Sequence, residues 1–302
     1  MRSGALRWTL LGMLWWAVSA EVSPQASAQS ARSAFPVPSS VRIIRDVPYA
    51  LYGRRELKLD VYLPPEGRVD RARPAVIVVR GGAWQSGDKE GFGFIAGQLA
   101  EEGFVAASIE YRTSSEAKFP AAVHDVKAAV RWMRANAASY GVDPEAIGAV
   151  GGSAGGHLVA MLATSGGVEA LEGSGGNRGT SSRVQAVVAM ACVCDLARME
   201  GAPTRQFIGG PPERYAETIK AASPVTYVNA RSAPLLLLHS RTDPSVPFDQ
   251  SVEISSLYRR AGALAVLREI QATDTHAFWN DAPYFPETMM EAVRFFREHL
   301  AK

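Results

Sequence analysis

Eight short runs with the pattern of strands alternate with helical patterns along residues 41–300 of this 302-residue chain. Several of these runs, such as AVIVV at 75–79 and LLLLH at 235–239, are apolar throughout. Continuous apolar runs are typical of parallel strands that are covered on both faces. Helices between such strands predict an α/β domain with a mostly parallel sheet. The predicted strands lie within residues 41–49, 57–63, 75–79, 104–111, 147–150, 184–191, 235–239 and 265–270.

Three of the connecting helices can be placed from the spacing of their apolar residues and from the residues that end them. Segment 119–140 carries Val123, Val126 and Val130 on one face and stops at Gly141, as helices commonly do at glycine. The last helix has an apolar stripe of the same kind, which predicts one buried face. The predicted helices span residues 119–140, 249–261 and 286–300.

Two stretches interrupt this alternation of strands and helices. Residues 166–182 are rich in glycine and serine, which predicts a long surface loop. Residues 197–228 are too many for a simple connection between two elements. We therefore expect the second stretch to form a small cap insertion beside the functional site.

The sequence GGSAGG at 151–156 lies between a predicted strand and a helical pattern. Its first five residues spell G-x-S-x-G, the pattern of a sharp strand-to-helix turn with strained backbone angles. Side chains at positions 151 and 155 would collide with neighbouring backbone, so glycine is needed at both. Such a turn exposes Ser153 Oγ at a helix N-terminus, which stabilises developing negative charge. A glycine-rich turn with an incidental serine is the alternative, and the flanking strand and helix favour a nucleophile.

A nucleophilic serine needs a histidine base that is itself oriented by an acid. Among the five histidines, only His276 lies on a loop after the last strand and before the final helix. We therefore predict His276 as the base, with His239, at the end of an earlier strand, as the second candidate. His157 follows Ser153 by one helical turn and is expected to pack beneath the turn. The other two histidines lie within predicted helices.

The acid is expected between the serine and the histidine, directly after a strand. Asp243, in the sequence LLLLHSRTDPSVP, meets both conditions. Asp249 follows a few residues later, but we expect it to cap the next helix. Asp195, after the preceding strand, is the third candidate.

Acyl transfer also requires hydrogen-bond donors for a tetrahedral oxyanion. The sequence RGGAW at 80–84 follows the strand at 75–79. Glycine in this place lets backbone N–H groups approach such an oxygen. A tight turn after a strand is the plain structural alternative.

The first 20 residues differ in composition from the rest of the chain. Arg2 and Arg7 accompany an apolar run at 9–18, and small-residue cleavage patterns end at Ala20 and Ala28. We interpret this segment as a secretory signal peptide, because its apolar run is shorter than the ~20 residues that a membrane-spanning helix needs. The protein is therefore expected to be secreted or periplasmic.

The remaining composition is that of an ordinary globular protein. The net charge of +2 and the lack of a Lys/Arg run argue against a nucleic-acid partner. Cys192 and Cys194 are predicted to be free thiols in a buried strand, and no neighbouring ligands indicate a metal site. The predicted regions are a signal peptide at 1–20, a disordered linker at 21–40 and a catalytic domain at 41–302.

These residues together resemble the α/β-hydrolase superfamily, in particular bacterial esterases of the hormone-sensitive-lipase-like and feruloyl or acetylxylan esterase groups. The resemblance covers nearly all of residues 41–300 and includes GGAWQSGDK, GGSAGGHLVAMLATS and HSRTDPSVPFDQS. It implies an α/β-hydrolase fold with a mostly parallel eight-stranded sheet flanked by helices. By this likeness Ser153 is the nucleophile, His276 the base and Asp243 the orienting acid. The oxyanion hole is implied at the N–H groups of Gly82, Ala83 and Ala154.

Four departures from the family pattern fall near the expected site. Arg80 stands where the family usually has histidine, Ser240 where it has glycine, and Arg241 where an acidic residue is common. The sequence MACVCDL at 190–196 replaces an aromatic-Gly-Pro segment. Arg80 could brace the loop through carbonyl or carboxylate partners, or it could place a fixed positive charge in the cleft. We favour bracing, because many carbonyls lie in reach of a strand end.

The sequence thus predicts an exported serine esterase that acts on short-chain or carbohydrate-linked esters through an acyl-enzyme. No cofactor, metal, nucleic-acid partner or stable membrane insertion is expected. Another acyl hydrolase, of the arylformamidase or peptidase type, is the first alternative; the missing loop histidine and the lack of a propeller-length extension argue against it. A non-catalytic α/β-hydrolase binding module is the second alternative, and the presence of all three triad residues argues against it.

Overall fold

The computed structural model describes residue 1 and residues 35–66, 71–86 and 88–300. The predicted signal peptide, apart from its first residue, and residues 21–34 of the predicted linker lie outside this described part.

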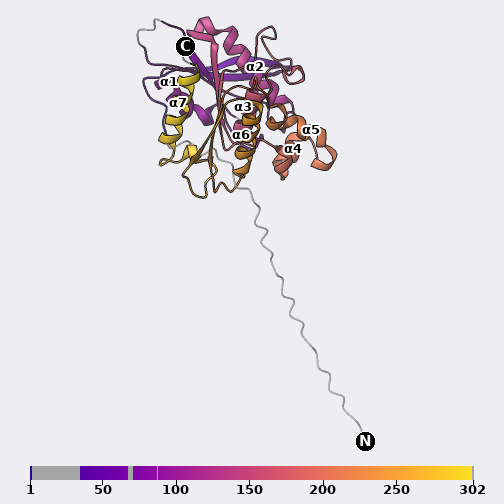
Figure 1. Cartoon of the computed structure of the whole chain (residues 1–302). Coiled ribbons are helices and arrows are strands. Elements are labelled where there is room, and N and C mark those ends of the chain that lie inside the picture. Colours follow the sequence, from indigo (N-terminus) through magenta and orange to yellow (C-terminus); the bar gives the residue numbers. More distant parts are fainter. Residues whose placement is uncertain (2–34, 67–70, 87, 301–302) are drawn as a thin grey trace. The chain divides into compact units, whose positions relative to one another are not determined.

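Within the described residues, eight strands form one sheet in the order β1-β2-β4-β3-β5-β6-β7-β8 (Figure 1). Strand β2 pairs antiparallel with β1 and with β4, and every other neighbouring pair is parallel. The eight predicted strands and the mostly parallel sheet are therefore confirmed. The strands span Arg42–Tyr52 (β1), Arg55–Leu63 (β2), Arg73–Val79 (β3), Val105–Ile109 (β4), Val142–Gly152 (β5), Ala186–Met190 (β6), Leu235–Ser240 (β7) and Ala265–Ile270 (β8).

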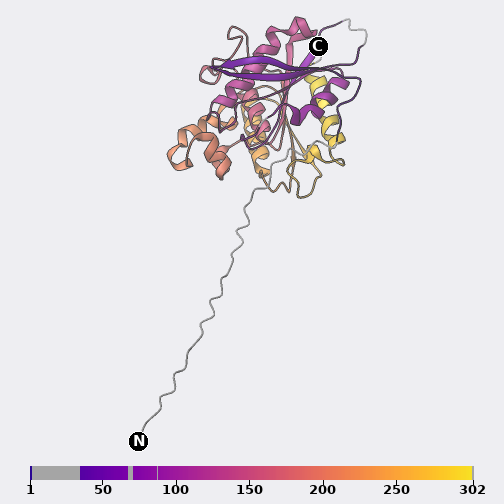
Figure 2. The ribbon, with the colours of Figure 1, turned by 180° about the vertical axis from the view of Figure 1, so that it is seen from behind.

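Helices cover both faces of this sheet (Figures 1 and 2). Helices α1 and α7 pack together on one face, and α2, α3 and α6 pack on the other. The short helices α4 and α5 lie in the stretch predicted as a cap insertion, between β6 and β7. The helices span Gly93–Glu101 (α1), Ala121–Ala135 (α2), Ala154–Thr164 (α3), Ala202–Ile208 (α4), Ala216–Ala222 (α5), Asp249–Ala261 (α6) and Phe285–Leu300 (α7).

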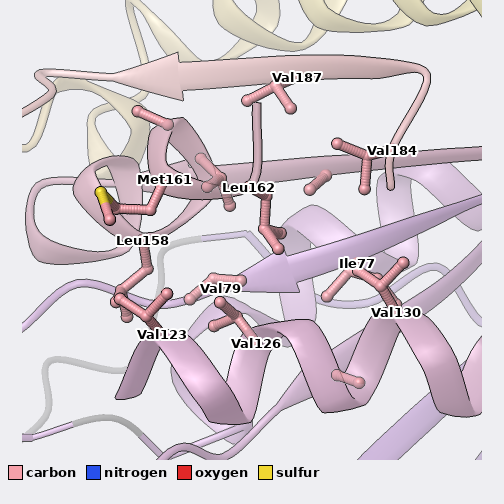
Figure 3. Packing of buried hydrophobic residues seen from close by; sticks show 14 of the residues in the cluster. Ile77, Val79, Val123, Val126, Val130, Leu158, Met161, Leu162, Val184 and Val187 are labelled. Carbon is pink, nitrogen blue, oxygen red and sulfur yellow. The ribbon is translucent and has the colours of Figure 1, made fainter. Parts of the chain in front are cut away.

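Strand β3 shows why the central strands are apolar throughout. Ile77 and Val79 belong to the core beneath α2 and α3, where Figure 3 shows Val79 beside Val126 of α2. The alternate residues Val76 and Val78 belong to the second core, beneath α1 and α7. Each such side chain contributes about 1.5–3 kcal/mol when it is fully buried. A strand with two buried faces is therefore mostly apolar, as β3 is.

The predicted helix at 249–261 matches α6 at both ends, and the predicted helix at 286–300 begins one residue early as α7. Helix α2 ends at Ala135, five residues before the predicted end. A short 3-10 turn at Ala137–Tyr140 continues the chain as far as Gly141, whose φ of 64° places it in the left-handed region. The glycine therefore stops the turn rather than the helix itself.

Residues 35–40, which the composition assigns to the linker, instead lie against the domain. The Phe35 ring stacks on the Phe285 ring with centroids 4.0 Å apart. Val37 packs so closely on α1 that a Cβ added at Gly97 would lie 2.7 Å from its Cγ1. These two apolar side chains pack on α7 and α1, so the packed domain begins before residue 41.

The prediction of free thiols is wrong, because a disulfide joins Cys192 to Cys194. Strand β6 ends at Met190, and Ala191 turns the chain with a φ of 44°. The cysteines therefore do not lie on a regular strand. Their Cα atoms are 5.6 Å apart, a separation that a disulfide spans.

Candidate active site

Ser153 lies at a sharp turn between β5 and α3, with φ 57° and ψ −123°. Such a backbone conformation costs about 1–3 kcal/mol in a residue other than glycine and persists only where surrounding contacts hold it. One such contact is the hydrogen bond that the Ser153 N–H donates to Met190 O, at 2.9 Å. The turn carries the serine side chain to the carboxyl end of the parallel strands.

The glycines on both sides of Ser153 are required by close backbone approach. A Cβ on Gly151 would lie 2.5 Å from Gly155 O, and a Cβ on Gly155 would lie 2.1 Å from Val79 O. Both distances are well inside van der Waals contact, and the obstructing atoms belong to the backbone. The expectation that side chains at these two positions would collide with backbone agrees with this geometry.

The structure brings Ser153, Asp243 and His276 together. Asp243 lies just after the end of β7 and His276 lies on the loop between β8 and α7. His276 Nε2 is 2.8 Å from Ser153 Oγ, and His276 Nδ1 is 2.7 Å from Asp243 Oδ2. Because a carboxylate only accepts, Nδ1 carries the proton and Nε2 is free to accept the serine proton.

Asp243 is held in its charged form by several donors. Its side chain is completely buried, and its Oδ1 accepts the N–H groups of Ser245 and Val246 at 2.8 and 2.9 Å. Burial by itself would raise the pKa of Asp243. Hydrogen bonds from His239, His276 and the Val246 N–H outweigh burial and hold the pKa well below its usual range. The carboxylate is therefore charged at neutral pH.

His239, the second candidate for the base, is fully buried at the end of β7. Its Nδ1 lies 2.8 Å from Ser251 Oγ, and its Nε2 lies 3.0 Å from Val246 O and 3.4 Å from Asp243 Oδ2. Both ring nitrogens are thus directed at groups other than Ser153. His239 therefore contacts the acid Asp243 and not the serine.

The other acid candidates have different roles. Asp249 begins α6 and forms an ion pair with Arg198 at 3.7 Å. Asp195 accepts a hydrogen bond from the Ala197 N–H at 2.9 Å, at the start of a 3-10 turn. Neither carboxylate contacts His276.

The loop at 80–86 follows β3 and has an unusual backbone. Gly82, Ala83 and Trp84 have φ values of 126°, 54° and 57°, so two residues other than glycine occupy the left-handed region. Within the described residues, no acceptor takes the N–H of Gly82, of Ala83 or of Ala154. All three residues line one pocket together with Ser153. This arrangement can supply donors to a negatively charged oxygen.

Arg80 forms an ion pair with Asp88, whose other carboxylate oxygen accepts the Gly91 N–H at 2.7 Å. The buried Tyr111 hydroxyl lies 3.2 Å from Arg80 O and 3.1 Å from Ser86 O. The Tyr111 hydroxyl therefore holds both ends of the loop at 80–86 in place. The guanidinium has a carboxylate partner, as bracing requires, although Arg80 also lines the pocket.

The pocket in front of Ser153 has a volume of about 480 Å³ and is mostly apolar. Its walls come from five parts of the chain that are distant in sequence. The sequence located the residues on the 80–84 loop, the serine turn and His276, and it placed the insertion at 197–228 beside the site without naming its wall residues. Ala277, Trp279 and Asn280 follow His276 closely in sequence, and Ser245 and Val246 follow Asp243, so nearness to a predicted site residue was the signal that could have found them. The walls missed are formed by Phe92, Val193, Met199, Glu200, Pro203, Thr204, Ser245, Val246, Ala277, Trp279 and Asn280.

In the part of the chain that the structure describes, no three His, Cys, Asp or Glu side chains group in a way that could hold a metal ion. Nor does any helix there have the length and apolar character needed to cross a membrane.

The sheet order, the serine turn and the flanking helices define an α/β-hydrolase fold, as the sequence resemblance implied. The chain belongs to the BD-FAE family, whose model matches residues 59–258. It is 35% identical over 261 residues to esterase LipQ of Mycobacterium tuberculosis, an alignment that covers 83% of this chain and 61% of LipQ. The chain therefore spans about three fifths of the length of this curated relative.

Solved structures show the same fold. A truncated carbohydrate esterase from gut microbiota superposes with a TM-score of 0.79 at 31% identity, covering 89% of this chain and 100% of that one. Esterase 2 of Thermogutta terrifontis with propionate bound superposes with a TM-score of 0.73 at 30% identity, covering 88% and 98% of the two chains.

Proposed function

We propose that this protein is an exported serine esterase that hydrolyses short-chain or carbohydrate-linked carboxylic esters. The observation that carries this proposal is the hydrogen-bonded series from Ser153 through His276 to Asp243, with Ser153 and His276 lining an apolar pocket. Similarity to proteins described as esterases and as a carbohydrate esterase supports the same chemistry.

The geometry allows each step of ester hydrolysis to be assigned. Ser153 Oγ attacks the ester carbonyl carbon while His276 Nε2 takes the hydroxyl proton, and the buried Asp243 charge stabilises the resulting imidazolium. The carbonyl oxygen becomes negative and accepts hydrogen bonds from the N–H groups of Gly82, Ala83 and Ala154.

Collapse of this first tetrahedral intermediate breaks the bond to the alcohol, which leaves with the proton from His276. Water then gives a proton to His276 and attacks the acyl-enzyme. The second tetrahedral intermediate releases the carboxylic acid and returns the proton to Ser153. Proton transfers of this kind contribute about 10²–10⁴-fold each.

The pocket supports the proposal of small acyl groups. Its volume of about 480 Å³ lies in the lower part of the range for small-molecule sites. The insertion at 197–228 contributes Met199, Glu200, Pro203 and Thr204 to one wall, and its two helices have only seven residues each. A wall this small cannot enclose a long lipid chain.

Export rests on the composition of residues 1–20. Mass spectrometry of the protein from the periplasm or medium of its native host tests it directly, with cleavage after Ala20 or Ala28 as the expected result. An intact Met1 on a membrane-bound product would show an anchor instead.

The activity is tested with purified protein, a fluorophosphonate label and a panel of acetyl, butyryl, feruloyl and palmitoyl esters at matched solubility. We expect stoichiometric labelling of Ser153, its loss in S153A and faster hydrolysis of the short or feruloyl esters. Labelling without hydrolysis of any ester would point to another acyl hydrolase, and no labelling at all to a binding module.

A further inference from the structure

His157 and Trp84 form a buried pair at the candidate active site, where Trp84 lines the pocket in front of Ser153. Trp84 lies in the loop at 80–86, next to Gly82 and Ala83. Its indole Nε1 is 3.1 Å from His157 Nδ1, and the ring centroids are 5.3 Å apart in an edge-on arrangement. His157 is fully buried and Trp84 is 3% exposed, so water does not compete for this contact.

The partners of His157 fix its protonation. An indole N–H can only donate, so Nδ1 must be the unprotonated acceptor. On the other side of the ring, Nε2 lies 2.7 Å from Ala222 O, which can only accept, so Nε2 carries the proton. The ring is therefore neutral, and each nitrogen has one well-defined role.

This ring joins three parts of the chain that are distant in sequence. His157 is on α3, and its N–H donates to Ser153 O at 2.9 Å. Trp84 belongs to the loop that offers the N–H groups of Gly82 and Ala83. Ala222 is the last residue of α5, in the insertion that also provides a wall of the pocket. The contacts tie the loop and the insertion to the helix that carries the serine.

The loop needs such a contact, because Ala83 and Trp84 both have left-handed backbone angles that side-chain-bearing residues disfavour. The Trp84 ring also stacks on Phe207 of α4, with centroids 4.6 Å apart and an interplanar angle of 16°. Stacking fixes the orientation of the indole plane. The hydrogen bond to His157 prevents the indole from sliding within that plane.

We propose that His157 is a positioning residue for the loop at 80–86. By accepting a hydrogen bond from the indole N–H of Trp84, it sets the distance between the backbone N–H groups of Gly82 and Ala83 and that of Ala154 on α3. This inference rests on the proposed esterase function. Because the oxyanion exists only after attack, misplacing the donors affects the chemical step more than substrate binding. His157 touches neither substrate nor reacting atoms, so it acts through Trp84.

Three variants separate this role from simple packing. W84F keeps a ring against Phe207 but removes the donor. In H157N, the amide oxygen stands where the imidazole has Nδ1 and can still accept from Trp84. In H157Q, the amide nitrogen reaches toward Ala222 O, as Nε2 does, but no acceptor remains for the indole.

The expected result for W84F and for H157Q is a fall in kcat on a neutral acetyl ester of ~10–10²-fold, with KM changed less than ~3-fold. The loss in H157N is expected to be at least ~5-fold smaller than in H157Q. The double variant W84F/H157Q should be no worse than either single one, because both remove the same contact. Thermal unfolding and fluorophosphonate titration of Ser153 show that each variant is folded and count its active sites.

The inference is overturned if W84F and H157Q are both folded, both react with fluorophosphonate at Ser153, and both keep kcat within ~2-fold of the wild type. It is also overturned if H157N and H157Q lose equal activity, since the acceptor at the Nδ1 position would then be irrelevant. If H157Q does not fold, the kcat values of W84F and H157N relative to the wild type still test the inference. A wild-type protein that labels at Ser153 but hydrolyses no ester would instead refute the proposed function.

Discussion

Replacing Asp243 with asparagine gives the most direct test of the proposed site. Asp243 Oδ1 already accepts two backbone N–H groups, from Ser245 and Val246. The amide oxygen of the asparagine must take this place, because an NH₂ group there would face two donors. The NH₂ group is then directed at His276 Nδ1, which can accept it only by giving up its own proton.

The consequence is a change of tautomer. With Nδ1 unprotonated, neutral His276 carries its proton on Nε2, which lies 2.8 Å from Ser153 Oγ and can no longer accept the serine proton. In other serine hydrolases, the same substitution lowers kcat by about 10⁴-fold. At ~1.36 kcal/mol for each factor of ten, this loss corresponds to ~5.4 kcal/mol of transition-state stabilisation. We expect a fall of this size in D243N.

The assay is kcat for a neutral acetyl ester near pH 8, with thermal unfolding as a check that the variant is folded. D249N is the matched control, because Asp249 is exposed at the start of α6 and does not contact His276. It should retain wild-type activity. A folded D243N enzyme with kcat within ~10-fold of the wild type would show that the acid lies elsewhere and refute the tautomer argument.

Three further predictions follow from the same contacts. R80A should lower kcat on a neutral ester by up to ~10²–10³-fold, the effect of one lost oxyanion donor; unchanged kcat with a salt-sensitive rise in KM for anionic esters would favour charge steering. G155A should reduce the free energy of unfolding in urea by at least about 1–3 kcal/mol, because its Cβ would meet Val79 O, whereas G179A has open space and should change little. The Asp243 pKa is lowered in the folded state, so its stabilisation is present above the unfolded pKa of about 4 and is lost as pH falls below it. Urea unfolding of wild type and D243N at pH 6 and pH 3 should show a difference that shrinks at the lower pH.

Local patterns predicted most of the secondary structure. Several strands were found because a strand buried on both faces is mostly apolar along its length, and this property is visible in a short window. Helix α6 was placed at both ends, since Gly262 ends it with a φ of 73°. Helix α1 was not placed, because the sequence GFIAGQLAE is apolar on nearly every side and shows no clear helical period. Its burial between α7 and the sheet decides its conformation.

At the site, too, local patterns located single residues, and the packed fold set the contacts between them. The serine turn needs glycine at fixed positions next to Ser153, so the sequence alone located it, and the loops after the last strands indicated Asp243 and His276. Hydrogen bonds among these three residues depend on strand order, which brings the carboxyl ends of β5, β7 and β8 to one edge of the sheet.

Contacts between distant segments were decided by the tertiary structure alone. Arg80 could have faced carbonyls, a carboxylate or the cleft, and the position of Asp88 selected the carboxylate. The prediction of free thiols assumed that Cys192 and Cys194 lie on a regular strand, but the turn at Ala191 ends that strand before them. The sequence by itself determined which residues can bend, bury or react, because these are properties of single side chains and their neighbours. Which of them meet, and hence the pocket walls and the His157–Trp84 pair, depends on distances that exist only in the packed fold.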